Sequence, residues 1–169
     1  MKSIKNRDDL GSLLRGLGLN GFGCEIGVQR GHNAKQILSQ WNGQKFYLVD
    51  LWVGRSARFY PNIISHFSKI SNVKIIKSSS IEASKMFTDS YFDWVYIDAA
   101  HDFNNVLADL VSWYPKVRSG GLIAGHDYTS RRSHWGVRPA LEAFLKVLSK
   151  QPEIYLTQDF AKTFYFIKN

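Results

Sequence analysis

The sequence predicts an α/β fold, a doubly wound sheet of five parallel strands that ends in a C-terminal antiparallel hairpin. Short apolar runs of strand length alternate along the chain with segments whose apolar residues recur at helical spacing. Strands linked through a helix run parallel, whereas the last two runs are too closely linked for a crossover helix and should pair antiparallel. We therefore expect one mixed sheet of seven strands.

The expected elements follow in order. A leading helix covers residues 7–19, because four leucines share one face and glycines weaken its end. The five parallel strands are the apolar runs at 21–28, 45–49, 73–77, 92–97 and 122–124. Helical spacing predicts the intervening helices at 32–38, 63–70, 81–87 and 103–117, and a last one at 136–150. The terminal strands lie at 153–157 and 163–167. Because no repeat or linker interrupts the pattern, residues 1–169 should form one domain, with the leading helix within residues 1–20.

Composition bounds the class of protein. No apolar run approaches the roughly 20 residues that span a bilayer, and no apolar segment follows the first basic residues, so we expect a cytoplasmic protein without a secretory signal. Cys24 is the single cysteine and cannot form an internal disulfide. The net charge of +8 raises the question of a nucleic-acid partner. Because the basic residues are scattered, with the densest group at Arg131, Arg132 and Arg138, we interpret the excess mainly as solvated surface.

Ionisable side chains follow two of the expected strands directly. Asp98 and His101 come after the strand at 92–97, and His126 and Asp127 come after the strand at 122–124. Parallel strands have their carboxyl ends at one edge of the sheet, so these four residues should converge there. Ligands of open α/β sheets bind at that edge. The four residues are therefore candidates for catalysis.

A second set of candidates follows the first two strands. Gly27 and Gly31 open a turn after Glu25, where backbone N–H groups and a helix start can approach a ligand closely. The spacing lacks the glycine pattern of a pyrophosphate-binding fingerprint, so the turn suits a ligand without pyrophosphate. Asp50 ends the second strand, where an acid binds ribose hydroxyls in crevices of this kind.

Taken together, four motifs resemble those of class I S-adenosylmethionine-dependent methyltransferases with a Rossmann-like sheet. More narrowly, the chain is similar to small stand-alone methyltransferase-domain proteins related to the sugar O-methyltransferases of macrolide biosynthesis. The motifs are Glu25-Ile26-Gly27-Val28-x-x-Gly31, Val49-Asp50, Tyr96-Ile97-Asp98-Ala99-Ala100-His101 and Gly120-Gly121-Leu122-Ile123-Ala124-Gly125-His126-Asp127-Tyr128. The resemblance covers nearly the whole chain from about Gly21 onward.

The resemblance implies a cofactor site for S-adenosylmethionine. Glu25, Gly27 and Gly31 would surround its methionine end, Val28 would also bind the cofactor, and Asp98 would close the pocket near the methionine or the substrate. Asp50 would hold the ribose, with Leu51 and Trp52 against the adenine. Ser79, Ser80 and Ile81 would contact the adenine ring and its amino group. One departure is that Gln29 and Arg30 fill a turn in which many of these enzymes have an extra glycine.

The expected function is methyl transfer to an oxygen of a small-molecule acceptor such as a sugar. An alcohol must lose a proton, and we expect His101 to act as base, oriented by Asp98 or Asp102, with His126 and Asp127 beside it. The resemblance also implies a divalent metal on Asp98 and Asp127, although His126 stands where a further acid is usual. Two alternatives stay open: an RNA ribose methyltransferase, and a non-catalytic module that only binds the cofactor. The chain could also form a homo-oligomer.

Overall fold

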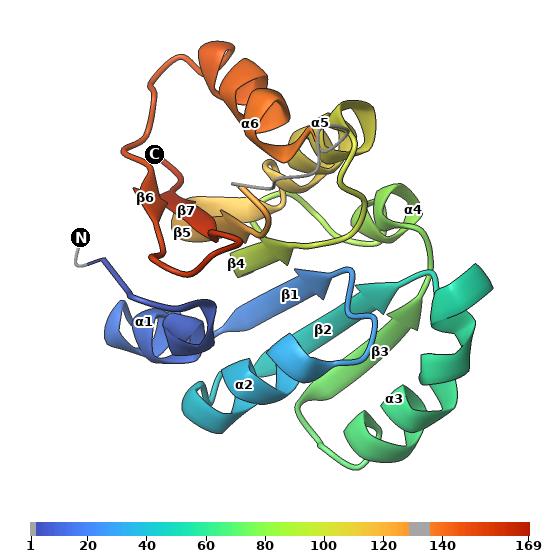
Figure 1. Ribbon diagram of the computed structural model, residues 1–169. Helices are drawn as coiled ribbons and strands as arrows, with labels where there is room; N and C mark the ends of the chain where they lie inside the picture. The colour runs from blue at the N-terminus through green and yellow to red at the C-terminus, as the bar shows by residue number, and fades with distance from the viewer. Residues whose placement is uncertain (1–2, 129–135) are drawn as a thin grey trace.

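A computed structural model of the protein describes residues 3–128 and 136–169. Its centre is a seven-stranded sheet with the strand order β3-β2-β1-β4-β5-β7-β6 (Figure 1). The strands are β1 (Phe22–Ile26), β2 (Lys45–Asp50), β3 (Val73–Lys77), β4 (Phe92–Ile97), β5 (Val117–Gly125), β6 (Tyr155–Leu156) and β7 (Phe164–Ile167). β1 to β5 pair in parallel, and β7 pairs antiparallel with both β5 and β6. The predicted fold class is confirmed.

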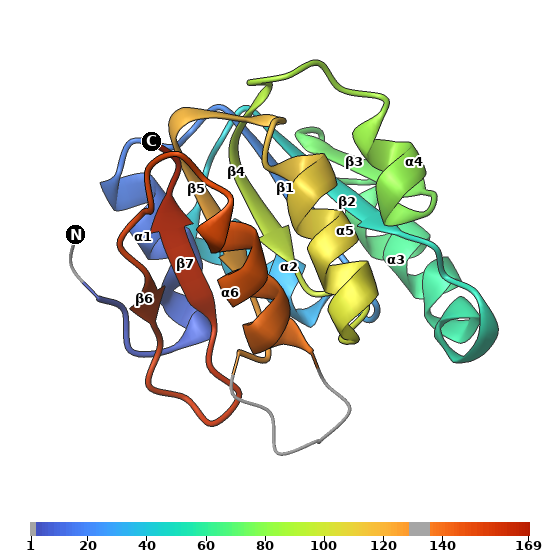
Figure 2. The same cartoon turned by 90° about the horizontal axis from the view of Figure 1, so that it is seen from above.

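Helices cover both faces of this sheet, as the views in Figures 1 and 2 show. The helices are α1 (Leu10–Gly16), α2 (His32–Gln40), α3 (Tyr60–Phe67), α4 (Ser80–Ser84), α5 (Phe103–Trp113) and α6 (Val137–Lys146), with 3-10 helices η1 (Arg7–Asp9) and η2 (Gly54–Phe59). The apolar residues of α1, α2 and α3 pack in one core, and those of α4, α5 and α6 pack in a second core across the sheet. No helix within residues 3–128 and 136–169 has the length and apolarity needed to cross a membrane.

Side-chain alternation along the central strands fills both cores. In β4, Trp94 and Tyr96 belong to the first core, while Val95 and Ile97 belong to the second, and all four are buried. A parallel strand with helices on both faces needs apolar residues at successive positions, which is the run that the sequence shows. Because both cores end at the last residue of β4, the polar residues that follow it lie at the edge of the sheet.

The structure differs from the sequence prediction at the start of β5. The strand was predicted at 122–124, but β5 begins at Val117 and includes Gly120 and Gly121. Phe92 pairs with Val117 and Trp94 with Leu122, so extra residues bulge out of β5 between these two pairs. Gly120 has a φ of +73°, which glycine adopts readily, and so the glycines serve a bulge within the strand.

Smaller differences concern helix ends and one loop. The leading helix is shorter than expected, since residues 7–9 form η1 and α1 ends at Gly16. The segment between β2 and α3, to which the sequence analysis assigned no element, contains η2. Arg131 and Arg132 of the predicted basic group lie outside the described residues.

The two ends of the chain lie side by side at one edge of the sheet (Figures 1 and 2). The Ile4 backbone N–H donates to the Tyr165 hydroxyl at 2.9 Å, and the Gln158 N–H donates to the Lys5 carbonyl at 2.8 Å. The Arg7 N–H donates to Asp159 Oδ2 at 3.0 Å. We call these three contacts the terminal clasp; they fix the segment before α1 against the C-terminal hairpin.

Candidate functional site

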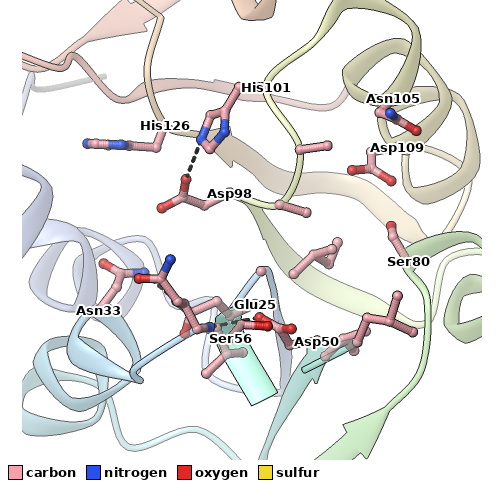
Figure 3. A pocket seen from close by; sticks show the side chains of 18 of the residues that line it. Glu25, Asn33, Asp50, Ser56, Ser80, Asp98, His101, Asn105, Asp109 and His126 are labelled. Carbon is pink, nitrogen blue, oxygen red and sulfur yellow. Dashed lines mark hydrogen bonds and ion pairs between the residues drawn. The ribbon is translucent and has the colours of Figure 1, made fainter. Parts of the chain in front are cut away.

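A cavity of about 670 Å³ opens at the carboxyl ends of the parallel strands. Its walls come from the turns that follow β1 to β5, and twelve of the fourteen predicted site residues line it: Glu25, Gly27, Val28, Asp50, Leu51, Ser79, Ser80, Ile81, Asp98, His101, His126 and Asp127. Figure 3 shows Asp98, His101 and His126 grouped together, with Ser80, Asn105 and Asp109 on another side. The convergence that the strand pattern predicted is therefore present, whereas Gly31 and Trp52 are not part of the lining.

The glycine turn after β1 brings two strand ends into close contact. Gly27 has a φ of +90°, and a Cβ there would lie 2.1 Å from the Asp98 carbonyl oxygen. The Gly27 N–H donates to the Val49 carbonyl at 2.9 Å, and the Asp98 N–H donates to the Ile26 carbonyl at 2.8 Å. Only glycine permits this conformation and approach together. Gly31 has a φ of +74° and closes the turn at the start of α2 without reaching the cavity.

Glu25 is a buried carboxyl group at the floor of the cavity. Its side chain is about 1% exposed, and Oε1 accepts a hydrogen bond from Asn33 Nδ2 at 3.2 Å. Within the described part of the chain, Oε2 is buried and has no hydrogen-bond partner. Burial raises the pKa of Glu25 to about 8, although the Asn33 hydrogen bond opposes this. A buried polar atom without a partner is a position that a bound ligand can complete.

Asp50 is held rigidly by the backbone around it. Its Oδ2 accepts from the Gln29 N–H at 2.8 Å, and its Oδ1 accepts from the Trp52 N–H at 2.7 Å. Each carboxylate oxygen keeps a lone pair for a further donor. Leu51 is 45% exposed at the cavity, but Trp52 is 1% exposed and packs in the first core, with its indole N–H donating to the Gln29 carbonyl at 3.0 Å. Trp52 therefore supports the turn from behind.

A polar group that the sequence analysis did not identify lines the cavity beside Ser80. Asp109 on α5 is 4% exposed, and burial raises its pKa to about 6, with a hydrogen bond to Ser80 opposing the shift. The indole N–H of Trp113 donates to Ser80 Oγ at 2.8 Å. An acid on the apolar face of a helix, between Val106 and Leu110, is the signal that could have revealed Asp109.

The acids and imidazoles after β4 and β5 form one charged cluster. His101 Nε2 lies 3.0 Å from Asp127 Oδ2 and 3.5 Å from Asp98 Oδ1, and His126 Nδ1 lies 3.2 Å from the same Asp127 oxygen. Burial alone would lower the pKa of His101, but the hydrogen bonds and charges of Asp127 and Asp98 raise it to about 9. Burial opposes the ionised form of Asp127, but the hydrogen bonds from His101 and His126 hold its pKa well below the usual range. At neutral pH, His101 is mainly an imidazolium.

Arg7 also lines the cavity, although it is far from the other site residues in sequence. Its Nη1 lies 3.5 Å from Asp98 Oδ2, so Asp98 has a cation on each side. Burial alone would lower the pKa of Arg7, but Tyr96 and Asp98 raise it and keep the guanidinium charged. No local pattern in the sequence pointed to Arg7, because its place in the cavity depends on the terminal clasp.

Three donors of the cluster could hold a divalent metal. One atom each from Asp98, His101 and Asp127 lie within 4.8 Å of one another. The predicted ligands Asp98 and Asp127 are thus close together, and His101 is close to both. Two carboxylate oxygens and an imidazole nitrogen fit a divalent ion, and the nitrogen favours manganese, iron or zinc over magnesium.

The fold and the cavity define a class I S-adenosylmethionine-dependent methyltransferase domain, for which S-adenosylmethionine is the cofactor. The unpartnered Glu25 oxygen and the fixed Asp50 carboxylate leave polar positions in this cavity that a bound ligand can use. Residues 24–128 match the methyltransferase domain family, and the chain belongs to this family.

Individual similar proteins show the same fold with different chemistry. The chain resembles the rRNA methylase of Streptococcus thermophilus at 12% identity, with 99% of each chain covered and a TM-score of 0.71. It resembles the O-methyltransferase of Bacillus cereus, solved with S-adenosylhomocysteine, at 16% identity, with 96% of this chain and 80% of that one covered and a TM-score of 0.69. An uncharacterized protein of Sinorhizobium fredii, y4gI, is 30% identical over 98 residues, which are 54% of this chain and 11% of that protein. The chain thus spans a small part of that relative.

Proposed function

We propose that the domain transfers the methyl group of S-adenosylmethionine to an oxygen of a small-molecule acceptor such as a sugar. The observation that carries this proposal is the acid–imidazole cluster of Asp98, His101, His126 and Asp127 in the same cavity as the glycine turn and Asp50. Methyl transfer from a sulfonium needs the acceptor held in line. An alcohol acceptor must also lose its proton, which requires the kind of group found in this cluster.

The cofactor would lie along the ends of β1, β2 and β4. In this placement the turn at Glu25, Gly27 and Val28 surrounds the methionine part, and Asp50 accepts hydrogen bonds from the ribose. Leu51 would cover one side of the adenine, and Ser79, Ser80 and Ile81 would contact its edge. Asp98 would close the methionine end. Gly31 and Trp52 would act indirectly, because they shape the turn and hold Asp50 without lining the cavity.

The two histidines have different roles in this proposal. His101 is mainly protonated at neutral pH, so it would serve as a fixed positive charge beside the forming alkoxide rather than as the base. His126 donates from Nδ1 to Asp127, which leaves Nε2 as the atom that accepts the acceptor's proton. The expectation that His101 is the base is therefore replaced by a proposal in which His126 has that role.

The metal stays a prediction that depends on the same residues. A divalent ion on Asp98, His101 and Asp127 would require His101 in its neutral form, and the ion would then replace the imidazolium as the charge that stabilises an alkoxide. Turnover that is lost with a chelator, and restored by manganese or zinc, would support this prediction. Full turnover in the chelator would contradict it.

Cofactor binding is the first test. Calorimetry with S-adenosylhomocysteine should show binding to the wild type and at least tenfold weaker binding to Asp50→Ala. Asp89→Ala is the matched control, because Asp89 has a 71% exposed side chain that pairs with Lys116 away from the cavity. Thermal unfolding of both variants checks the fold, since Asp50→Ala also removes two backbone hydrogen bonds. No binding to the wild type would reject the proposal.

Acceptor chemistry is the second test. Release of S-adenosylhomocysteine is measured with free sugars, nucleotide sugars and ribo-oligonucleotides as acceptors. His126→Gln should lower kcat about 100-fold or more while cofactor affinity changes less than twofold. Methylation of the oligonucleotides, with RNA binding that falls steeply as salt rises, would instead favour the RNA ribose alternative, which the net charge of +8 supports. Cofactor binding without turnover of any acceptor would favour the non-catalytic alternative.

A further inference from the structure

The segment before α1 is held in place by contacts with a distant part of the chain. The segment contains one short 3-10 helix, η1, which has a capping box between Asn6 and Asp9 and no buried residue. The terminal clasp nevertheless holds this segment to the C-terminal hairpin by three hydrogen bonds to residues more than 150 positions away. The side chain that the clasp places in the cavity is Arg7.

The Arg7 guanidinium has donors to spare. Its hydrogen bond to Asp98 Oδ2 spans 3.5 Å, longer than the about 2.7–2.9 Å that is common for a charge-assisted N–H···O bond. A guanidinium carries five N–H donors in a planar fork that matches a carboxylate in two parallel bonds. Asp98 has a second cation, His101, at the same distance of 3.5 Å on its other oxygen. Arg7 is thus a partly buried cation that interacts with Asp98 and Tyr96, and its carboxylate partner Asp98 is shared with His101 and distant.

Glu25 provides a complementary group at the same end of the cavity. The charges of Arg7 and Glu25 are close enough that Arg7 opposes the rise in the Glu25 pKa, and Oε2 of Glu25 has no partner in the described part of the chain. The end of the cavity that lies between β1 and β4 therefore offers one cation with unused donors and one carboxyl oxygen without a hydrogen-bond partner in the described part of the chain. An α-amino acid zwitterion supplies the two matching groups.

We propose that Arg7 binds the α-carboxylate of the methionine part of the cofactor, while Glu25 receives its amino group. This inference rests on the cofactor placement in the proposed function, in which Asp50 holds the ribose and the methionine part points to Asp98. The first residues and the C-terminal hairpin would then complete the cofactor site together. Among the described residues, the other arginine that lines the cavity is Arg30, which is exposed and has its guanidinium 4.7 Å from the ring centre of Phe59.

The experiment compares three ligands that differ in the groups concerned. Binding of S-adenosylmethionine, decarboxylated S-adenosylmethionine and 5′-methylthioadenosine is measured by calorimetry for the wild type, Arg7→Ala and Arg7→Lys. Arg15→Ala is the matched control, since Arg15 lies on α1 and does not line the cavity. The wild type should bind S-adenosylmethionine more tightly than the decarboxylated form. Arg7→Ala should lose about 10- to 100-fold in affinity for S-adenosylmethionine and less than twofold for the other two ligands. Arg7→Lys should keep part of the affinity, because it keeps the charge without the fork.

Three results would overturn the inference. The first is an equal loss for all three ligands in Arg7→Ala, which would show that Arg7 only supports the fold through the clasp. The second is a carboxylate-dependent loss in Arg30→Ala with none in Arg7→Ala. The third, which needs no variant, is a wild type that does not distinguish the decarboxylated ligand. A failure of the proposed function looks different, because the wild type would then bind none of the three ligands.

Discussion

Replacing Gly27 by alanine tests whether the turn after β1 needs glycine for its shape alone or also for contact with β4. The added Cβ would lie 2.1 Å from the Asp98 carbonyl oxygen, 2.4 Å from its carbon and 2.6 Å from Ala99 Cα. These are backbone atoms, so the two strand ends would have to separate. The φ of +90° adds a strain of about 1–2 kcal/mol, and the overpacking adds about 1–3 kcal/mol. We expect a loss of about 2–5 kcal/mol in the free energy of unfolding, measured by urea denaturation.

Gly54→Ala separates the two contributions. Gly54 has a φ of +54°, but a Cβ there meets nothing within 4 Å. This variant should lose only the conformational part, about 1–2 kcal/mol. Gly27→Ala should also weaken binding of S-adenosylhomocysteine, because separating the strand ends displaces Asp98 from the cavity floor. Equal losses of stability in the two variants, with unchanged binding in Gly27→Ala, would refute the reasoning.

Three further predictions concern buried groups. The pKa of Glu25 is about 8 in the folded protein and about 4.5 in the unfolded chain, so between these pH values the folded state binds one more proton. The free energy of unfolding should therefore fall as pH rises from 5 to 8, by up to about 1.4 kcal/mol per pH unit. Urea denaturation at several pH values should show a weaker dependence of the unfolding free energy on pH for Glu25→Gln, and an unchanged dependence would contradict the assignment. Burial raises the pKa of the Cys24 thiol, so a thiol reagent should label the native protein far more slowly than the denatured one; fast native labelling would argue against this packing. Trp113→Phe should cost about 1–3 kcal/mol of stability through the lost hydrogen bond to Ser80 and the smaller ring, and a change below about 0.5 kcal/mol would show that this contact contributes little.

Sequence periodicity was sufficient for the strand assignment because the information is local. β3 and β4 have the predicted bounds, and the antiparallel pairing of the last two strands follows from the short connection between them. The predicted start of β5 was wrong because a glycine pair occurs both in turns between elements and in bulges within strands. Its identity as a bulge depends on how β5 pairs with β4, and the Asp93 carboxylate that binds Arg118 beside the bulge lies on that other strand.

The same difference between local and long-range information applies to the residues of the candidate site. Residues that follow strand ends were predictable, because the parallel arrangement brings every such end to one edge. Trp52 also follows a strand, but its φ of +43° turns the residue away from the cavity, and its indole packs in the first core. Arg7 could not be found from spacing, since 91 residues separate it from Asp98. Asp109 could have been found, since an acid at a core-facing helix position is unusual.

The arrangement of charges explains why distant parts of the chain meet in this cavity. Asp98 and Asp127 follow neighbouring parallel strands, and neighbouring cations offset the repulsion between two carboxylates so close together. His101 supplies one from the turn after β4, and Arg7 supplies the other from the start of the chain. Since the Arg7 backbone N–H donates to Asp159 of the C-terminal hairpin, this hairpin contributes to the cavity without lining it. The antiparallel hairpin thus affects the charges around Asp98, because its Asp159 binds the backbone of Arg7 and Arg7 pairs with Asp98.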